Sequence, residues 1–131
     1  MPAPQLDALG FVATDLPRSL AFYRLLGLDI PAQADSEQHV EHTLANGLRL
    51  MWDTTAIIAG MDAHWSPPTG GHRMALAFLC ETPAEVDAVY AAITAAGFTG
   101  HLAPWDAFWG QRYATLHDPD GNAVDLFAPL A

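Results

Sequence analysis

Hydrophobic and polar positions follow the same order in two stretches of the chain, residues 8–28 (ALGFVATDLPRSLAFYRLLGL) and 75–98 (ALAFLCETPAEVDAVYAAITAAGF). Each stretch reads as a short apolar run, a polar residue suited to cap a helix, a proline, an amphipathic helix and a glycine. The pattern predicts one strand followed by one helix in each stretch. Their likeness indicates a weak internal repeat.

The ends of the two predicted helices are marked by capping residues. Asp15 is placed to cap the first helix and Gly27 to end it. Thr82 and Glu85 form a capping-box pattern at the start of the second, and Gly97 stops it.

Further strand-like segments follow each helix. The predicted strands are 39–44 and 48–52 in the first half, and 110–116 and 123–127 in the second. The turns between them are Asn46-Gly47, a hairpin signal, and Asp118-Pro-Asp-Gly121, which favours a type I turn. The order is therefore β-α-β-β-β twice, with one weakly marked strand in each half.

The chain length predicts a single domain over residues 1–131, of α+β class. Two βαβββ modules, at about 5–58 and 72–129, are joined by a Pro/Gly-rich link at about 59–71 that we expect to be extended or looped. Each module can curl into a small sheet with its helix on the convex side. Together they would form one concave sheet, which is a natural pocket.

Composition narrows the class of partner. The 15 acidic against 5 basic residues give a net charge of -10, which disfavours nucleic acid. No apolar run has the length of a signal peptide or a membrane span, so we expect a cytoplasmic protein that does not use a membrane. There is no GxSxG motif, and the single cysteine, Cys80, is in an apolar strand pattern typical of a buried thiol.

Two motifs, DLPRSLAFYRLLGL (15–28) and DPDGNAVDLF (118–127), resemble the vicinal-oxygen-chelate superfamily. That superfamily includes glyoxalase I, extradiol dioxygenases, fosfomycin-resistance enzymes and bleomycin-binding proteins. A narrower resemblance, to the mitomycin-resistance proteins of antibiotic producers, covers nearly the whole chain. Its motifs are ADSEQHVEHTLANGLRLMWDT, WSPPTGGHRMALAF, GHLAPWDAFWGQRYA and DPDGNAVDLFAPL. Drug-sequestering proteins for anthraquinone-fused enediynes look related too.

The narrower resemblance implies a domain-swapped homodimer with two equivalent pockets that binds a small-molecule antibiotic without chemical change. It also implies that a tryptophan and a histidine, matching Trp109 and His39 here, sandwich a flat ring system. No cofactor and no catalytic residue are implied.

The superfamily's enzymes bind a divalent metal through residues in both halves of the chain. In each half, one ligand position lies in the first strand and one lies in the last strand. Aligning the chain on its own repeat and on DPDGN places Ala8, Met51, Ala75 and Asp125 at these positions. Only Asp125 can be a hard oxygen ligand, whereas a catalytic site usually needs three protein ligands. We therefore expect no metal.

Histidine is the commonest metal ligand, so its positions need a separate test. His39 and His42 share one predicted strand, and their odd spacing sends them to opposite faces. His72 is displaced from the ligand position at residue 75. The other three are predicted to be solvated or capping residues in loops: His64, His101 and His117.

Strand alternation assigns residues to the concave face. The small side chains expected on that face are Ala8, Gly10, Ala75 and Ala77. They leave volume that a bulky ligand could fill, though close approach of the strands would also explain the small residues.

Trp109, Gln111 and Tyr113 share one face of a strand that Trp109 opens. Met51, Asp125 and Phe127 share the inner face. Such a lining suits a stacked planar ligand, oriented by hydrogen bonds from Gln111, Tyr113 and Asp125.

The other tryptophans are less informative. Trp52 is expected to take part in ordinary core or dimer packing, and Trp105 is expected to pack the turn formed by Pro104 and Asp106. Trp65 fits either the pocket rim or a dimer contact.

These observations favour an antibiotic-binding self-resistance protein for a planar quinone-type or polycyclic drug. The alternatives are a metal-dependent enzyme of the same superfamily, glyoxalase- or dioxygenase-like, and a scaffold or regulator with a vestigial pocket.

Overall fold

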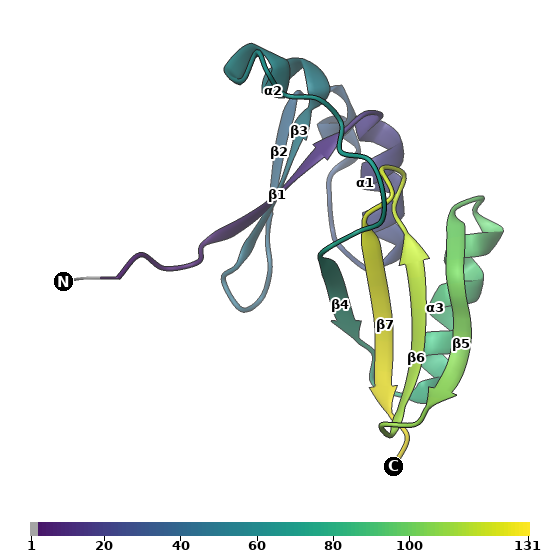
Figure 1. Cartoon of the computed structure of the whole chain (residues 1–131). Helices are drawn as coiled ribbons and strands as arrows, with labels where there is room; N and C mark the ends of the chain where they lie inside the picture. Colours follow the sequence, from purple (N-terminus) through teal and green to yellow (C-terminus); the bar gives the residue numbers. More distant parts are fainter. Residues whose placement is uncertain (1–2) are drawn as a thin grey trace. The chain divides into compact units, whose positions relative to one another are not determined.

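The computed structural model describes residues 3–131, which form an α+β fold of two compact units (Figure 1). The first unit extends to Pro67 and the second begins at Pro68. Each unit has its own sheet and its own helix packed against that sheet.

The first unit begins with β1 (Ala8–Ala13) and α1 (Leu16–Leu25), followed by a 3-10 turn, η1 (Ala32–Ser36). Next come β2 (His39–Thr43), β3 (Arg49–Thr54) and α2 (Thr55–Met61). The sheet order is β1-β3-β2, with β1 parallel and β2 antiparallel to β3. Tyr23 of α1 packs edge-on against Trp52, and Phe11 stacks on Trp52 at 5.3 Å between ring centroids. Trp52 is fully buried, which agrees with the core alternative of its predicted packing.

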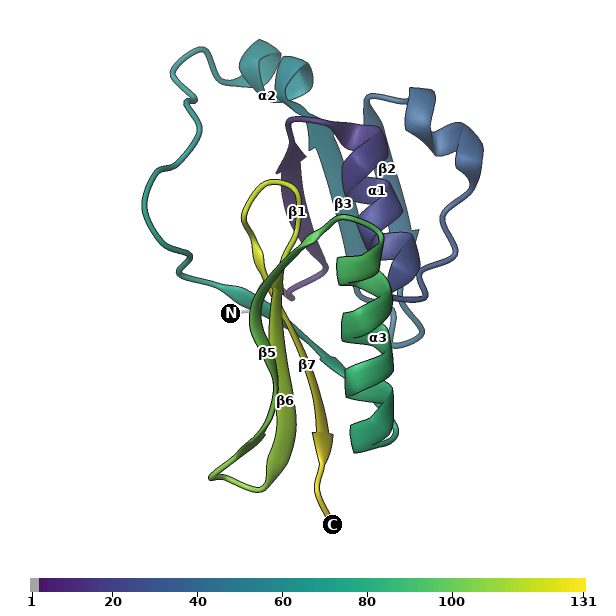
Figure 2. The same ribbon diagram turned by 90° about the vertical axis from the view of Figure 1, so that its right-hand side faces the viewer.

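The second unit consists of β4 (Ala75–Leu79), α3 (Pro83–Ala95), β5 (Thr99–Ala107), β6 (Gln111–His117) and β7 (Ala123–Pro129). Its sheet order is β4-β7-β6-β5, with β4 parallel to β7 and the other pairs antiparallel. Helix α3 runs along one face of this sheet (Figure 2). Val86 and Ile93 of the helix are fully buried, as are Val124 and Leu116 of the strands.

The predicted helix signals are confirmed. The Asp15 carboxylate accepts a hydrogen bond from the Arg18 backbone N–H, and Thr82 accepts one from Glu85. Both helices end as predicted, since Gly27 and Gly97 have positive φ angles of 96° and 94°.

Both predicted turns are also present. The Leu44 carbonyl accepts from the Gly47 N–H, which closes the hairpin between β2 and β3. In the second turn the Asp118 side chain accepts backbone hydrogen bonds from Asp120 and Asn122, and the Asp118 carbonyl accepts from Gly121. Asp118 is only 3% exposed, so these hydrogen bonds to its carboxylate stabilise the turn from its buried side.

The βαβββ prediction is correct for the second half and wrong for the first. In the second half the weakly marked strand is β5, whose pairing with β6 is interrupted by two register shifts. Within residues 3–67 the sheet has three strands, and the segment Ala32–Ser36 forms the 3-10 turn instead. The predicted loop at 59–71 is also wrong at its start, because α2 continues to Met61.

The stretch around Trp109 differs from its prediction. Pro104, Trp105 and Asp106 lie within β5 rather than in a turn, and Trp105 pairs with Tyr113 across the strands. Trp109 does not open a strand but lies in the turn between β5 and β6, where Gly110 has a positive φ of 95°. A glycine at this position allows a short connection between two long strands.

Candidate functional site

The sheet of the second unit has one face against α3 and a second face that carries some of the predicted ligand-binding residues. Along β7, Val124 and Leu126 are buried, whereas Asp125 and Phe127, which alternate with them, are partly exposed. Residues in register with Asp125 and Phe127 extend this second face across the sheet; they are Ala77, Leu79, Tyr113 and Thr115. The predicted parity of these strands is therefore confirmed.

An aromatic cluster gathers at the end of this face where β5 turns into β6. Trp109 makes edge-to-face contacts with Trp105, Phe108 and Tyr113, with ring centroids 5.5, 4.9 and 5.4 Å apart. Tyr113 in turn stacks on Phe127 at 6.3 Å. Phe108 is 91% exposed and Trp109 is 48% exposed. Aromatic surface of this size at a turn is unusual for a merely structural role and suits a stacking partner.

Polar atoms beside the cluster are bonded to one another. The Trp109 indole Nε1 donates to Gln111 Oε1 at 2.7 Å. The Tyr113 hydroxyl donates to Asp125 Oδ2 at 2.6 Å, and the Thr115 hydroxyl donates to Asp125 Oδ1 at 2.8 Å. These bonds occupy the groups that were predicted to orient a ligand, so the cluster offers mainly the faces of its rings.

The Tyr113 hydroxyl is held in its protonated form. Burial disfavours the phenolate, and the neighbouring Asp125 carboxylate repels it, which together raise the pKa of Tyr113 to about 12. Tyr113 is therefore a hydrogen-bond donor to Asp125 and not a base at neutral pH.

The family's metal positions do not fit a divalent ion in this chain. Ala8 and Ala75 offer no ligand atom, and Met51 offers only a thioether. Both Asp125 oxygens already accept hydroxyl hydrogen bonds. Within residues 3–131, no group of three or more His, Cys, Asp or Glu side chains is arranged to hold a metal ion.

His39 and Met51 lie together on one face of the first unit's sheet. His39 is in register with Asp53, and Glu41 with Met51, which places all four on the same face. Gly10 pairs with Met51 from the other side, and a Cβ at position 10 would lie 3.9 Å from Met51 Cε. The end of the Met51 side chain therefore lies close beside Gly10.

A chain of charges holds His39 in place. Its Nδ1 lies 2.6 Å from Asp53 Oδ1, and its Nε2 lies 2.7 Å from Glu41 Oε2. Arg49 bonds both Glu41 and Asp7. Hydrogen bonds to Glu41 and then to Asp53 raise the pKa of His39 above its ordinary value. The His39 and Arg49 side chains lower the pKa of Glu41.

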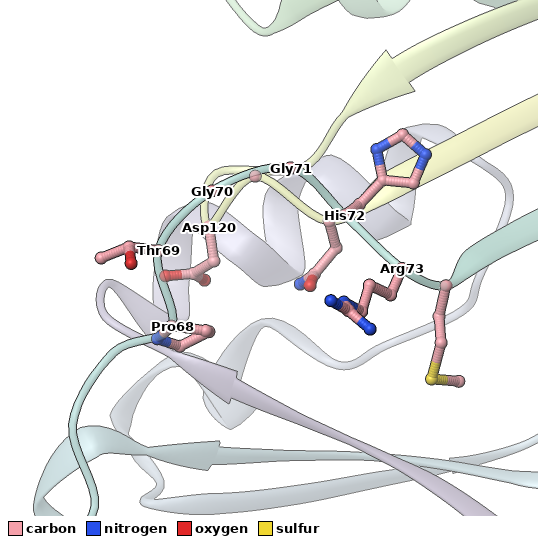
Figure 3. A pocket seen from close by; sticks show the side chains of 10 residues that line it. Pro68, Thr69, Gly70, Gly71, His72, Arg73 and Asp120 are labelled. Atoms are coloured by element: carbon pink, nitrogen blue, oxygen red, sulfur yellow. The ribbon is translucent and has the colours of Figure 1, made fainter.

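A shallow pocket of about 410 Å³ lies elsewhere in the second unit, between the segment Pro68–Met74 and the turn residues Asp120–Asn122. Figure 3 shows Asp120 at one end of it and His72 and Arg73 at the other. None of the predicted ligand-binding residues line it. Two consecutive glycines, Gly70 and Gly71, form part of its wall.

Three histidines that the sequence placed apart lie together in the second unit. His101 and His117 are in β5 and β6, not in loops, and their rings stack at 4.5 Å. His72 contacts His117 edge-on at 6.3 Å. Burial, followed by repulsion from His101 and His72, lowers the pKa of His117. Sequence reasoning missed the group because β5 is irregular and its pairing with β6 was not predicted.

The structure therefore divides the predicted binding residues between the two units. Trp109, Gln111, Tyr113 and Asp125 form one connected group in the second unit. His39 and Met51 share a face in the first. Trp65 follows α2, where its backbone N–H donates to the Asp62 carbonyl.

Cys80 is buried just beyond β4, as the sequence predicted. Burial, together with the Glu85 carboxylate, raises the pKa of its thiol, which disfavours the reactive thiolate.

Comparison with known families gives one match. Residues 5–126 match the Glyoxalase/Bleomycin resistance protein/Dioxygenase superfamily, and the chain belongs to this family. A search of curated proteins found no match.

Solved structures share the fold. A glyoxalase/bleomycin resistance protein/dioxygenase family enzyme from Burkholderia phytofirmans has a TM-score of 0.81 at 22% identity, covering 97% of this chain and all of that one. A glyoxalase-related enzyme from Fulvimarina pelagi has a TM-score of 0.79 at 19% identity, over 96% of this chain and 88% of that one. Protein ATC0852 from Agrobacterium tumefaciens is 27% identical, with a TM-score of 0.73, over 98% of this chain and 100% of that one.

Among residues 3–131, the helices are too short or too polar to cross a membrane.

Proposed function

We propose that this protein binds a planar quinone-type or polycyclic antibiotic and lowers its free concentration without changing it. Mitomycin-like and anthraquinone-fused enediyne-like drugs are the ligand classes to which the sequence motifs point. Trp109 is the main stacking platform, and His39 supplies the second ring against the ligand. The same proposal includes a domain-swapped homodimer.

The observation that carries the proposal is the aromatic cluster around Trp109. Half of the Trp109 side chain is exposed, and its only polar atom already donates to Gln111, so the ring is positioned without a ligand. Stacking on such a ring adds to the burial of apolar area, and it is tolerant of ring substituents. A protein that must retain a reactive drug without reacting with it benefits from this kind of contact.

The chemistry of the neighbouring residues supports binding over catalysis. Asp125, the one carboxylate at a metal position, is held by Tyr113 and Thr115. The Tyr113 phenol and the Cys80 thiol both have raised pKa values, so neither is a ready base or nucleophile at neutral pH.

The test is a titration of the purified protein with mitomycin C and with a planar anthraquinone, followed by tryptophan fluorescence. The expected result is saturable quenching at one drug per subunit, with the drug recovered unchanged by chromatography. Metal analysis of the same sample accompanies it. Stoichiometric metal together with turnover of the drug would instead support a metal-dependent enzyme. Absence of quenching by every planar drug would support a scaffold or regulator with a vestigial pocket.

A further inference from the structure

His39 has both ring nitrogens engaged by carboxylates. Nδ1 lies 2.6 Å from Asp53 Oδ1 and Nε2 lies 2.7 Å from Glu41 Oε2, so the two contacts lie along opposite edges of the ring. Asp53 reaches the ring from the adjacent strand β3, and Glu41 reaches it from two residues along β2. Arg49 bonds Glu41 from β3, and Asp7 bonds Arg49 from the segment before β1.

Only one protonation state satisfies both contacts. A neutral imidazole has a single N–H, so its second nitrogen would direct a lone pair at a carboxylate. An imidazolium donates to both, and such charge-assisted bonds are short, as these are. The pKa shifts of His39 and Glu41 agree with this state, because each group favours the charged form of the other. Strand β1, on the other side of β3, places no titratable group on this face of the sheet. Its residues on the face are Ala8, Gly10 and Val12.

The carboxylates leave the faces of the ring for a ligand. The His39 side chain is 44% exposed although both nitrogens are bonded. A ligand therefore meets the flat face of a cation and finds no free N–H on this residue.

We propose that His39 is the specificity-determining residue of the drug site, acting as an imidazolium fixed by Glu41 and Asp53 that stacks through its ring face. This inference rests on the proposed drug-binding function and specifies the class of drug. The site favours planar ring systems made electron-rich by phenol or amino substituents. It disfavours planar cations of the same size.

The physical basis is the attraction between a cation and the face of an electron-rich ring. At exposed sites this attraction corresponds to about a 2- to 5-fold gain in affinity. A planar cation meets repulsion at the same position. When His39 loses its proton at higher pH, the gain disappears, whereas stacking on the neutral Trp109 ring remains.

The experiment compares two tricyclic probes of similar size, neutral 1,4-dihydroxyanthraquinone and cationic 9-aminoacridine. Each is titrated by tryptophan quenching between about pH 5 and pH 9, which brackets the ordinary histidine range. For the wild type, the affinity for the dihydroxyanthraquinone should fall by about 2- to 5-fold as the pH rises. The affinity for 9-aminoacridine should rise or stay constant.

Three variants locate the effect. Glu41→Gln removes one carboxylate and should move the midpoint of the pH dependence to lower pH. Glu37→Gln makes the same change in the loop before β2 and should leave the midpoint unchanged. His39→Phe keeps a ring without a charge, and it should bind the dihydroxyanthraquinone with no pH dependence in this range. An unchanged midpoint in Glu41→Gln, or wild-type binding of both probes independent of pH, overturns the proposal.

A ligand-free measurement separates this proposal from the proposed function. The NMR signal of the His39 ring is followed against pH in the wild type and in Glu41→Gln. The expected midpoint lies above that of an ordinary histidine and falls in the variant. Quenching combined with an ordinary His39 midpoint overturns the role of His39 alone. A raised midpoint with no quenching by either probe at any pH contradicts drug binding itself, and the specificity role with it.

Discussion

The indole N–H of Trp109 donates a hydrogen bond to the side-chain oxygen of Gln111, two residues further along the chain, at 2.7 Å. Because Gln111 is the first residue of β6, the bond ties a ring in the connecting turn to the end of the sheet. The indole also makes T-shaped ring contacts with Trp105, Phe108 and Tyr113. The turn is short, and the side chain of its central residue is bonded to the sheet.

Trp109→Ala should weaken binding of a planar drug by about 1–3 kcal/mol, the range found for the loss of one base-stacking aromatic residue. Trp109→Phe keeps a smaller ring and should lose less. The Kd is measured by calorimetry, since the variant removes a fluorescent reporter. Equal affinity of wild type and Trp109→Ala would exclude the aromatic cluster as the binding platform.

His39→Ala should cost less binding free energy than Trp109→Ala, because the imidazole contributes a smaller ring. The same calorimetric titration measures it below the pH at which His39 loses its proton. Val12→Ala, a change at a neutral position of the same sheet face, is the matched control. The sandwich is wrong if both His39→Ala and Trp109→Ala bind the drug as well as the wild type.

Gln111→Ala tests a positioning role, because Gln111 acts on the ligand through Trp109. It should weaken drug binding by less than Trp109→Ala and alter the tryptophan near-UV circular dichroism. In a Trp109→Phe background, which lacks the indole N–H, the same change should have little further effect on binding. Gln33→Ala, at an exposed position of η1, serves as control. An equal loss in both backgrounds would show that Gln111 acts independently of the indole.

Asp125→Ala should lower the free energy of unfolding by about 1–3 kcal/mol, because it leaves the Tyr113 and Thr115 hydroxyls without their shared acceptor. Asp125→Asn keeps one acceptor oxygen and should lose less. Urea denaturation measures both, with the exposed Asp29→Ala as control. A fully stable Asp125→Ala would mean that this carboxylate is free for another role, metal binding included.

The raised pKa of Tyr113 predicts that its contribution to stability is lost in alkali. In the unfolded chain its phenol ionises near pH 10, whereas in the fold its pKa is about 12. The contribution of this residue is fully present below pH 10 and is lost as the pH rises towards 12, because the unfolded state alone releases the proton first. The difference in unfolding free energy between wild type and Tyr113→Phe should therefore shrink across this interval. A constant difference would contradict the raised pKa.

The sequence predicted the elements whose signals are local. Helix caps at Asp15 and Thr82 and the turns at Gly47 and Gly121 depend on residues a few positions apart, and all four are present. For Trp52 the sequence left core packing and dimer packing open, and the side chain is buried in the core.

Features that depend on pairing were missed. Strand β5 contains Gly100 and Pro104, which weaken a strand signal, and it is recognisable only by its irregular pairing with β6. Without that pairing, His101 could not be placed beside His117, nor Trp105 beside Trp109. The contact between the His39 and Asp53 side chains likewise required the register of β2 against β3.

The fixed orientation of Trp109 also bears on the rates of binding. A drug that stacks on this ring meets it already in place, so no loop has to order before contact. Association should therefore be fast and nearly the same in all variants that keep both the indole and the Gln111 side chain. Differences in affinity between drugs, or between wild type and variants such as His39→Ala, should then appear in the dissociation rate. Residence time on the protein, measured by stopped-flow displacement, determines how long each bound molecule is kept away from its target.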